Sequence, residues 1–383
     1  MLATDSPLLP VYAQLPVHPV RAQGSWLYDA AGERWLDAYG GHAVASTGHC
    51  HPKVVAAIAD QAARLLFYST VLPHPAREDL AAALVARCPA GLRKVFLVNS
   101  GAEANENALH LARKLTGRSR FVSIAGGWHG RTAATLAVTD GEKYMAGARR
   151  AGLPLSLKVP WNDPAALLSA VDDSIAGVIL EPVQGLTGAR DLPVELIQAA
   201  RQACDRVGAL LIFDEVQCGV GRCGAFTTAE AIGVTPDLLT LAKGLASGLP
   251  ISALITTEAV AAQVHTGDLG STFGGGPVPC AAALATLNVI EEERLIENAL
   301  TIGDRLRQGA LALGPGKVVA VQGRGLLLGL RLTRPAGEIQ TALLAHHILS
   351  GTSSDPQVLR LMPPLTFSRA EADQVLQALA EVL

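Results

Sequence analysis

The middle of the chain alternates between short apolar runs and longer segments with helical periodicity. Helical patterns fill residues 102–115 and 194–207. Six apolar runs have the length of buried strands: 94–100, 121–125, 176–181, 209–214, 238–242 and 251–256. Continuous apolar strands alternating with helices are typical of a mainly parallel sheet covered on both faces. We therefore predict a large α/β domain over residues 46–277.

The pattern changes after this region. A long helical segment at 278–313 comes first, and strand-like runs follow at 317–321, 325–332 and 358–361. This succession predicts a smaller α+β domain over residues 278–383. The first 45 residues contain a hairpin pattern, and we expect them to join the smaller domain.

Two charged groups stand where apolar runs end. Lys243 follows the run 238–242 and precedes a glycine, and Asp214 closes the run 209–214. In such sheets ligands bind beyond the carboxyl ends of the strands. Desolvation lowers the pKa of a lysine and makes its amine a nucleophile toward carbonyls. A Schiff-base lysine together with an acid for a ring nitrogen is what pyridoxal phosphate requires.

Other polar clusters also follow strands. Ser100, Gly101 and Ala102 join a strand to a helix N-terminus, where backbone N–H groups and the helix dipole attract a phosphate. The alternative is an ordinary serine N-cap. Trp128, between glycines, offers a face for stacking, and Arg131 offers a fork for a carboxylate. The alternative is a surface aromatic and a solvated arginine.

Two further segments carry candidate ligand-binding groups. Gln217, three residues after Asp214, can donate a hydrogen bond to a phenolic oxygen. Ser271 and Thr272 lie in a glycine-rich loop and bring hydroxyls for a phosphate or a substrate. The alternative for this loop is a flexible linker before the next helix.

One motif favours a rival function. The segment 219–224 fits GxGxxG and follows a strand, as in nicotinamide dehydrogenases. Five residues, including Asp214 and Glu215, separate the strand from the glycines, whereas the dinucleotide motif turns directly into a helix. These carboxylates would also repel a pyrophosphate. A non-enzymatic scaffold explains none of the polar clusters at strand ends.

Composition narrows the function classes. The chain has 383 residues, 49% hydrophobic residues and a net charge of −3, with no basic stripe for nucleic acid. No apolar stretch reaches the length of roughly 20 residues that spans a membrane, and residues 1–7 lack a signal-peptide pattern. We expect a cytoplasmic protein with reduced cysteines. We expect no metal site, because adjacent residues such as His49, Cys50 and His51 rarely converge on one ion.

Together these motifs resemble the class III pyridoxal-phosphate aminotransferases, most closely the acetylornithine aminotransferases. Asp214 and Lys243 are 29 positions apart (243 − 214), as in that family. The matching segments span nearly the whole chain: 48–52, 99–106, 128–132, 181–185, 213–217, 243–244, 270–275 and 359–365.

The resemblance implies fold type I, the aspartate-aminotransferase fold, and a homodimer with active sites at the subunit interface. It implies Lys243 and Asp214 as catalytic residues. The implied cofactor-binding set is Ser100, Gly101, Ala102, Trp128, Asp214, Glu215, Val216, Gln217, Lys243 and Thr272. In this set Trp128 stacks on the ring where the family usually has Phe, and Thr272 reaches the phosphate in the neighbouring subunit. The implied substrate-binding residues are Arg131, Ser271 and Arg360.

The implied reaction is a ping-pong transfer from an ω-amine through a Schiff base on Lys243. N-acetylornithine is the expected donor and 2-oxoglutarate the acceptor, within arginine biosynthesis; succinylornithine, ornithine or 4-aminobutyrate is the alternative donor. Arg131 and Arg360 are the expected anchors for two carboxylates. One residue departs from the family: Leu186 stands where a Glu usually pairs with the arginine at position 360. We expect Arg360 to be more available to carboxylates in both half-reactions, unless another group replaces that Glu.

Overall fold

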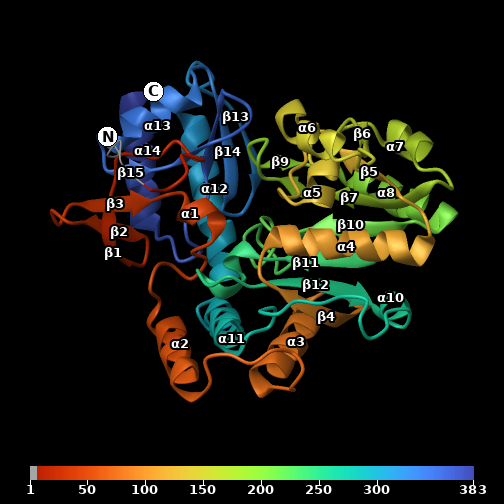
Figure 1. Cartoon of the computed structure of the whole chain (residues 1–383). Helices are drawn as coiled ribbons and strands as arrows, with labels where there is room; N and C mark the ends of the chain where they lie inside the picture. Colours follow the sequence, from red (N-terminus) through yellow and green to blue (C-terminus); the bar gives the residue numbers. More distant parts are fainter. Residues whose placement is uncertain (1–6) are drawn as a thin grey trace.

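The computed structural model describes residues 7–383, and its largest element is a seven-stranded sheet (Figure 1). The segment 1–6, on which the cytoplasmic expectation partly rests, lies outside the described residues. In spatial order the strands are β4 (Leu92–Val98), β12 (Ser252–Thr257), β11 (Leu238–Leu241), β10 (Leu210–Asp214), β7 (Ile175–Leu180), β5 (Arg120–Ile124) and β6 (Leu157–Val159).

The sheet is mixed but mainly parallel, as predicted. Strand β10 pairs in parallel with β7 and β11, and β5 pairs in parallel with β7 and β6. Only β12 runs against its neighbours β11 and β4. The sequence did not reveal β6, because it is a three-residue edge strand that begins with an exposed leucine. The carboxyl ends of β7, β10 and β11 therefore meet at one edge.

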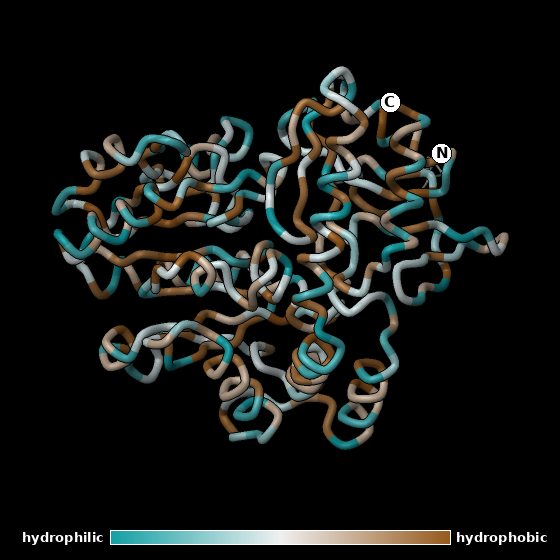
Figure 2. The backbone as a smooth tube through the Cα atoms, turned by 180° about the vertical axis from the view of Figure 1, so that it is seen from behind, coloured by the Kyte–Doolittle hydropathy of each residue, from teal (hydrophilic) through white to brown (hydrophobic). Residues whose placement is uncertain are grey.

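Both faces of this sheet are covered, which explains the unbroken apolar runs. Ile212 belongs to the hydrophobic cluster under α4 (Gly101–Thr116), whereas Leu211 and Phe213 belong to the cluster that contains α8 (Val194–Val207). Successive strand residues point to opposite faces, so a doubly covered strand must be apolar at every position. In Figure 2, which colours each residue by hydropathy, stretches of hydrophobic residues accordingly run through the interior of the molecule.

Seven smaller helices lie within the range 46–277. They are α2 (Pro52–Arg64), α3 (Pro75–Arg87), α5 (Ala133–Val138), α6 (Glu142–Arg150), α7 (Pro164–Ala170), α9 (Thr228–Ile232) and α10 (Glu258–Ala261). A two-stranded hairpin formed by β8 (Val183–Gln184) and β9 (Arg190–Asp191) connects β7 to α8.

The remaining strands form two four-stranded sheets. One contains β13 (Val318–Arg324), β14 (Leu327–Leu332), β17 (Val358–Leu361) and β16 (Gly351–Thr352). The other joins β1 (Pro19–Gln23), β2 (Trp26–Asp29) and β3 (Arg34–Asp37) to β15 (Ile348–Leu349). Because β15 pairs in parallel with β3, the first 45 residues pack with the C-terminal part of the chain. This pairing supports the proposed division into 46–277 and 1–45 with 278–383, which stays a prediction.

The expected helix over 278–313 is instead two helices, α11 (Pro277–Glu292) and α12 (Leu295–Ala312). The helical conformation is interrupted at Arg294, whose φ of 54° lies in the left-handed region that a right-handed helix excludes. Periodicity continues across such a break, so the pattern alone could not reveal it. Helix α12 packs against β13 and β14, and α13 (Ala336–Leu344) packs against β16 and β17 of the same sheet. Helix α14 (Arg369–Val382) packs on α12 and α13.

Among residues 7–383, no helix combines the length and apolarity that crossing a membrane requires. All six cysteines are free thiols, as expected: Cys50, Cys88, Cys204, Cys218, Cys223 and Cys280.

The contact between α12 and the β13–β14 turn generates a stability prediction. A Cβ at Gly303 would overlap the carbonyl oxygen of Gly325, whereas a Cβ at Gly337 in α13 would meet nothing within 4 Å. We expect Gly303→Ala to lower the free energy of unfolding by about 1–3 kcal/mol through overpacking. Gly337→Ala, the matched control, should raise it by up to about 1 kcal/mol through helix propensity. Urea unfolding of both variants checks this; stabilisation by both would contradict the close contact.

Candidate active site

A cavity of about 440 Å³ lies beyond the carboxyl ends of β7, β10 and β11. This is the edge at which ligands bind in open α/β sheets. Its lining combines the catalytic candidates with the N-terminus of α4: Tyr12, Val44, Asn99, Ser100, Gly101, Ala102, Asn105, Trp128, His129, Gly130, Arg131, Glu181, Asp214, Val216, Gln217, Ala242, Lys243, Gly248, Leu249, Pro250 and Ile251.

Lys243 opens a single 3-10 turn, Lys243–Ala246, directly after β11. Its φ of 46° is unusual for a residue with a side chain and marks a conformation that the surroundings enforce. Two contacts fix this turn: the hydroxyl of Ser46 donates to the carbonyl of Gly244 at 2.6 Å, and the hydroxyl of Ser247 accepts from the N–H of Thr47. Burial lowers the pKa of the Lys243 amine, which favours the nucleophilic neutral form.

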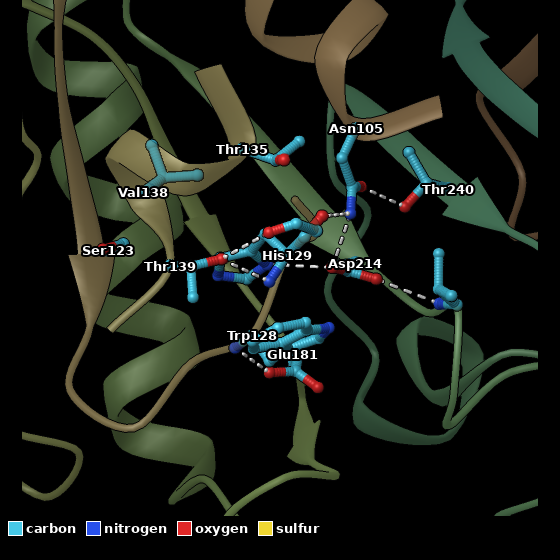
Figure 3. Close-up of polar contacts among 12 residues, drawn as sticks. Asn105, Ser123, Trp128, His129, Thr135, Val138, Thr139, Glu181, Asp214 and Thr240 are labelled. Carbon is cyan, nitrogen blue, oxygen red and sulfur yellow. Dashed lines mark hydrogen bonds and ion pairs between the residues drawn. The ribbon is translucent and has the colours of Figure 1, made fainter. Parts of the chain in front are cut away.

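Asp214 ends β10 and is held by three polar contacts. Its Oδ2 accepts from Nδ2 of Asn105 at 2.7 Å and lies 2.8 Å from Nδ1 of His129. Its Oδ1 accepts from the N–H of Val216 at 3.1 Å. Asn105 is fixed in turn by the hydroxyl of Thr240, which donates to Oδ1 of Asn105 at 2.8 Å. Figure 3 shows the side chains of His129 and Asn105 directed at Asp214.

A second buried acid, Glu181, follows β7 in the same cavity. Its two oxygens accept from the N–H of Trp128 at 2.7 Å and from the N–H of Gly185 at 3.1 Å. Burial, together with the nearby charge of Asp214, raises the pKa of Glu181 to about 7. The acid thereby fixes the loop that carries Trp128.

The N-terminus of α4 forms another wall. A capping box closes it, because the Ser100 hydroxyl accepts from the N–H of Glu103 and the Glu103 carboxylate accepts from the N–H of Ser100. The N–H groups of Gly101 and Ala102, in the first turn, have no partner within the helix and suit an anion. A Cβ at Gly101 would lie 2.6 Å from Cγ1 of Val216, so the close approach of Val216 requires glycine here.

Trp128 and Arg131 lie together at the cavity. The Arg131 guanidinium is 5.2 Å from the Trp128 ring and 5.6 Å from the Tyr12 ring, and its NH1 donates to the Tyr12 hydroxyl at 3.4 Å. Trp128 also meets Tyr144 edge to face, with ring centroids 4.7 Å apart. Arg131 is exposed, so its guanidinium is accessible to a carboxylate.

Arg360, in β17, lies beside the cavity instead of lining it. Its side chain is 8% exposed, and it donates to the carbonyls of Thr352 and Gly185 and to the Tyr39 hydroxyl. Its positive charge contributes to lowering the pKa of Lys243. Within residues 7–383, no carboxylate lies within 4.0 Å of this guanidinium.

Three predicted site residues lie away from the cavity. Glu215 accepts instead from the N–H groups of Thr228 and Ala229, at the start of α9. Ser271 accepts from Nδ2 of Asn99, a cavity residue, at 3.2 Å, and Thr272 is exposed. The roles of these residues toward cofactor and substrate stay predictions.

The rival dinucleotide motif lacks its required structure. The segment 219–224 forms turns, and α9 begins only at Thr228, so no helix opens at these glycines. His, Cys, Asp and Glu side chains of the described residues form no group of three or more that could hold a metal ion.

The side chains at the cavity fit pyridoxal phosphate. Lys243 supplies an amine, Asp214 an acid for the ring nitrogen, and Trp128 and Val216 apolar surfaces for the ring. The first turn of α4 suits the phosphate.

Sequence reasoning missed several functional candidates: Tyr12, Tyr39, Asn105, His129 and Glu181. His129 had a signal, since it follows Trp128 between glycines, and Glu181 directly follows a strand. Asn105 is a polar position on the buried face of α4. The contacts of Tyr12 and Tyr39 cross long stretches of chain and gave no local signal.

Comparison with known proteins defines the family. The model of the family "Aminotransferase class-III" matches residues 10–383. Acetylornithine aminotransferase 1 of Bordetella pertussis is 40% identical, covering 99% of this chain and 98% of that protein. Acetylornithine aminotransferase of Methanocaldococcus jannaschii is also 40% identical, with coverages of 98% and 95%.

Solved structures show the same fold. The ornithine aminotransferase of Toxoplasma gondii superposes with a TM-score of 0.91 at 28% identity, covering 98% of this chain and 92% of that chain. Acetylornithine aminotransferase from Elizabethkingia anophelis gives a TM-score of 0.85 at 26% identity, with coverages of 97% and 94%. The fold is therefore the type I fold that the sequence predicted. The chain belongs to the class III aminotransferases, a family of enzymes whose cofactor is pyridoxal 5′-phosphate.

Proposed function

We propose that this aminotransferase moves the terminal amino group of N-acetylornithine to 2-oxoglutarate, as a step of arginine biosynthesis. The observation that carries the proposal is the similarity, over nearly the full length, to proteins named acetylornithine aminotransferase. Succinylornithine, ornithine and 4-aminobutyrate are the alternative donors. Ornithine is an alternative because one of the similar solved structures, at 28% identity, is an ornithine aminotransferase.

The cavity residues have distinct tasks in this proposal. Pyridoxal phosphate, when bound, supplies an electron-accepting ring that takes up the charge released beside the amine. Lys243 would hold the cofactor covalently, and its amine, when free, would move a proton at the substrate carbon that carries nitrogen. Asp214 would pair with the ring nitrogen, and Asn105 and His129 keep its carboxylate in place. Trp128 would cover the ring and exclude water.

Two arginines hold the substrates in this proposal. Arg131 takes the donor carboxylate, and a dicarboxylate acceptor uses Arg131 and Arg360 together. The Arg–carboxylate pair is strong because the guanidinium donates two parallel hydrogen bonds. Leu186 cannot neutralise Arg360, and the groups that contact the Arg360 guanidinium are two backbone carbonyls and a phenol. No acid replaces the family's Glu among the described residues, which favours an Arg360 that is free to bind carboxylates in both half-reactions.

A homodimer completes the proposal. Residues 65–72 and the loop at 270–276 expose large apolar side chains, with Val71 81% and Phe273 64% exposed. The rings of Phe67 and Phe273 are in contact, with centroids 5.0 Å apart, so the two segments form one surface. Apolar surface of this kind is characteristic of subunit interfaces. Thr272 lies within it, in agreement with its expected reach toward the phosphate of a second copy.

The direct test is a panel of amino donors with 2-oxoglutarate. We expect N-acetylornithine to give the highest kcat/KM for glutamate formation, because the relatives at about 40% identity are named as aminotransferases of this donor. Lys243→Ala should abolish turnover, and Lys94→Ala, an exposed lysine on β4, should leave it unchanged. Preference for another donor in the panel would replace the proposed substrate, and turnover by Lys243→Ala would reject the proposed chemistry.

A substitution at position 186 tests the availability of Arg360. Leu186→Glu brings a carboxylate toward the Arg360 guanidinium and should compete with substrate carboxylates there. We expect kcat/KM for donors with a second carboxylate, such as succinylornithine, to fall several-fold relative to ornithine. Leu186→Gln controls for side-chain size. An unchanged ratio of donors in Leu186→Glu would contradict this role of Leu186.

A further inference from the structure

Arg360 is a buried cation whose three hydrogen-bond partners among residues 7–383 are neutral. Its guanidinium donates at 2.7 Å to the carbonyl of Thr352, at 3.1 Å to the carbonyl of Gly185 and at 2.8 Å to the Tyr39 hydroxyl. Burial lowers the pKa of Arg360, and the charge of Glu181 acts in the opposite sense. A buried cation whose hydrogen-bond partners are neutral is costly, and the cost is relieved when an anion binds. The Tyr39 hydroxyl is the one side-chain group among these three partners, and the other two belong to the backbone.

Tyr39 is itself held rigidly. Its backbone N–H donates to Oδ1 of Asp37 at 2.9 Å. Its ring lies against β16, where a Cβ at Gly351 would overlap it, and it meets the His42 ring edge to face with centroids 4.8 Å apart. The first contact fixes the backbone of Tyr39, and the other two restrict the position of its ring. The hydroxyl is thereby fixed before any substrate arrives.

The backbone that carries Tyr39 is strained. The four residues that follow, Gly40–Ala43, all have positive φ angles of 55–66°, including the non-glycine residues His42 and Ala43. A left-handed conformation is unfavourable for each L-residue with a side chain, because its Cβ comes too close to the following carbonyl oxygen. Gly40 has no alternative, because a Cβ there would lie 2.6 Å from the carbonyl oxygen of Met362. Such strain is concentrated at functional sites.

We propose that Tyr39 is a positioning residue that orients Arg360 for one carboxylate of a dicarboxylate substrate, in place of an acidic partner. This inference rests on the proposed use of 2-oxoglutarate as acceptor. The phenol restricts the guanidinium through a hydrogen bond but does not neutralise it, so the full charge is kept for the substrate. The site thereby favours substrates that bring a carboxylate to Arg360 over donors that need only Arg131.

The electrostatics around Tyr39 agree with this role. Burial raises the pKa of Tyr39, so the phenol stays neutral at physiological pH. His42 does not add a charge either, because burial and the nearby charges of Arg360 and Lys243 lower its pKa. Tyr39 and His42 are thus neutral side chains beside Arg360, and the charge that acts on both of them from behind is the Asp37 carboxylate, which favours a protonated form of each.

Tyr39→Phe in the cofactor-loaded enzyme is the test, because it removes the hydroxyl and keeps the ring. We expect glutarate, a dicarboxylate inhibitor, to bind about tenfold more weakly, and KM for 2-oxoglutarate and L-glutamate to rise by about the same factor. KM for N-acetylornithine and kcat should change less than twofold. Gly351→Ala, which displaces the Tyr39 ring, should reproduce the weaker glutarate binding, and Tyr28→Phe should have no effect.

Two results would overturn this role of Tyr39. Unchanged glutarate binding in Tyr39→Phe would show that the hydroxyl does not orient Arg360. An equal rise of KM for N-acetylornithine and 2-oxoglutarate, with a lower midpoint of thermal unfolding, would show a purely structural role. Glutarate binding does not depend on the amino donor, so a wild type that fails to use N-acetylornithine would reject the proposed donor and leave this test valid.

Discussion

The site depends on the parallel pairing of β10 and β11. Asp214 lies opposite Thr240 in this register, and Lys243 follows Thr240 by three residues, in the turn after β11. Two charged groups that are 29 positions apart in the sequence are therefore carried to one edge of the sheet. Because the sheet is covered on both faces, the acid is a buried side chain, and burial lowers the pKa of the amine. Both groups line one cavity, where electrostatic interactions are stronger than in water.

Other elements fix this pair. Asn105 from α4 and His129 from the loop after β5 contact the Asp214 carboxylate, and Glu181 after β7 holds the backbone at Trp128. The acid is thus oriented by groups from different parts of the sheet. Arg360, from β17, lies beside the same cavity, and its charge contributes to lowering the pKa of Lys243. A catalytic arrangement of this kind needs no movement of the acid during reaction, which is the benefit of preorganisation.

The sequence predicted those features that depend on local pattern. The apolar runs predicted six strands of the large sheet, and the charges at run ends predicted Lys243 and Asp214. Contacts between distant segments were not accessible: the Tyr39–Arg360 hydrogen bond joins residues 321 positions apart. Backbone conformation was also inaccessible, since neither the break at Arg294 nor the left-handed turn Gly40–Ala43 changes the hydrophobic period. Position next to a site residue can also mislead. Glu215 follows Asp214 directly, yet its carboxylate accepts from a backbone N–H at the start of α9 instead of lining the cavity.

In the proposed reaction the Asp214 carboxylate, which lines the same cavity as the Lys243 amine, keeps the ring nitrogen of the cofactor positive. The most direct measurement is the rate of the half-reaction of cofactor-loaded Asp214→Asn with L-glutamate, followed by stopped flow. We expect a rate about 10²–10³-fold below wild type, because an amide cannot stabilise a positive ring nitrogen as a carboxylate does. A rate within about threefold of wild type, with the cofactor still bound to Lys243, would contradict it.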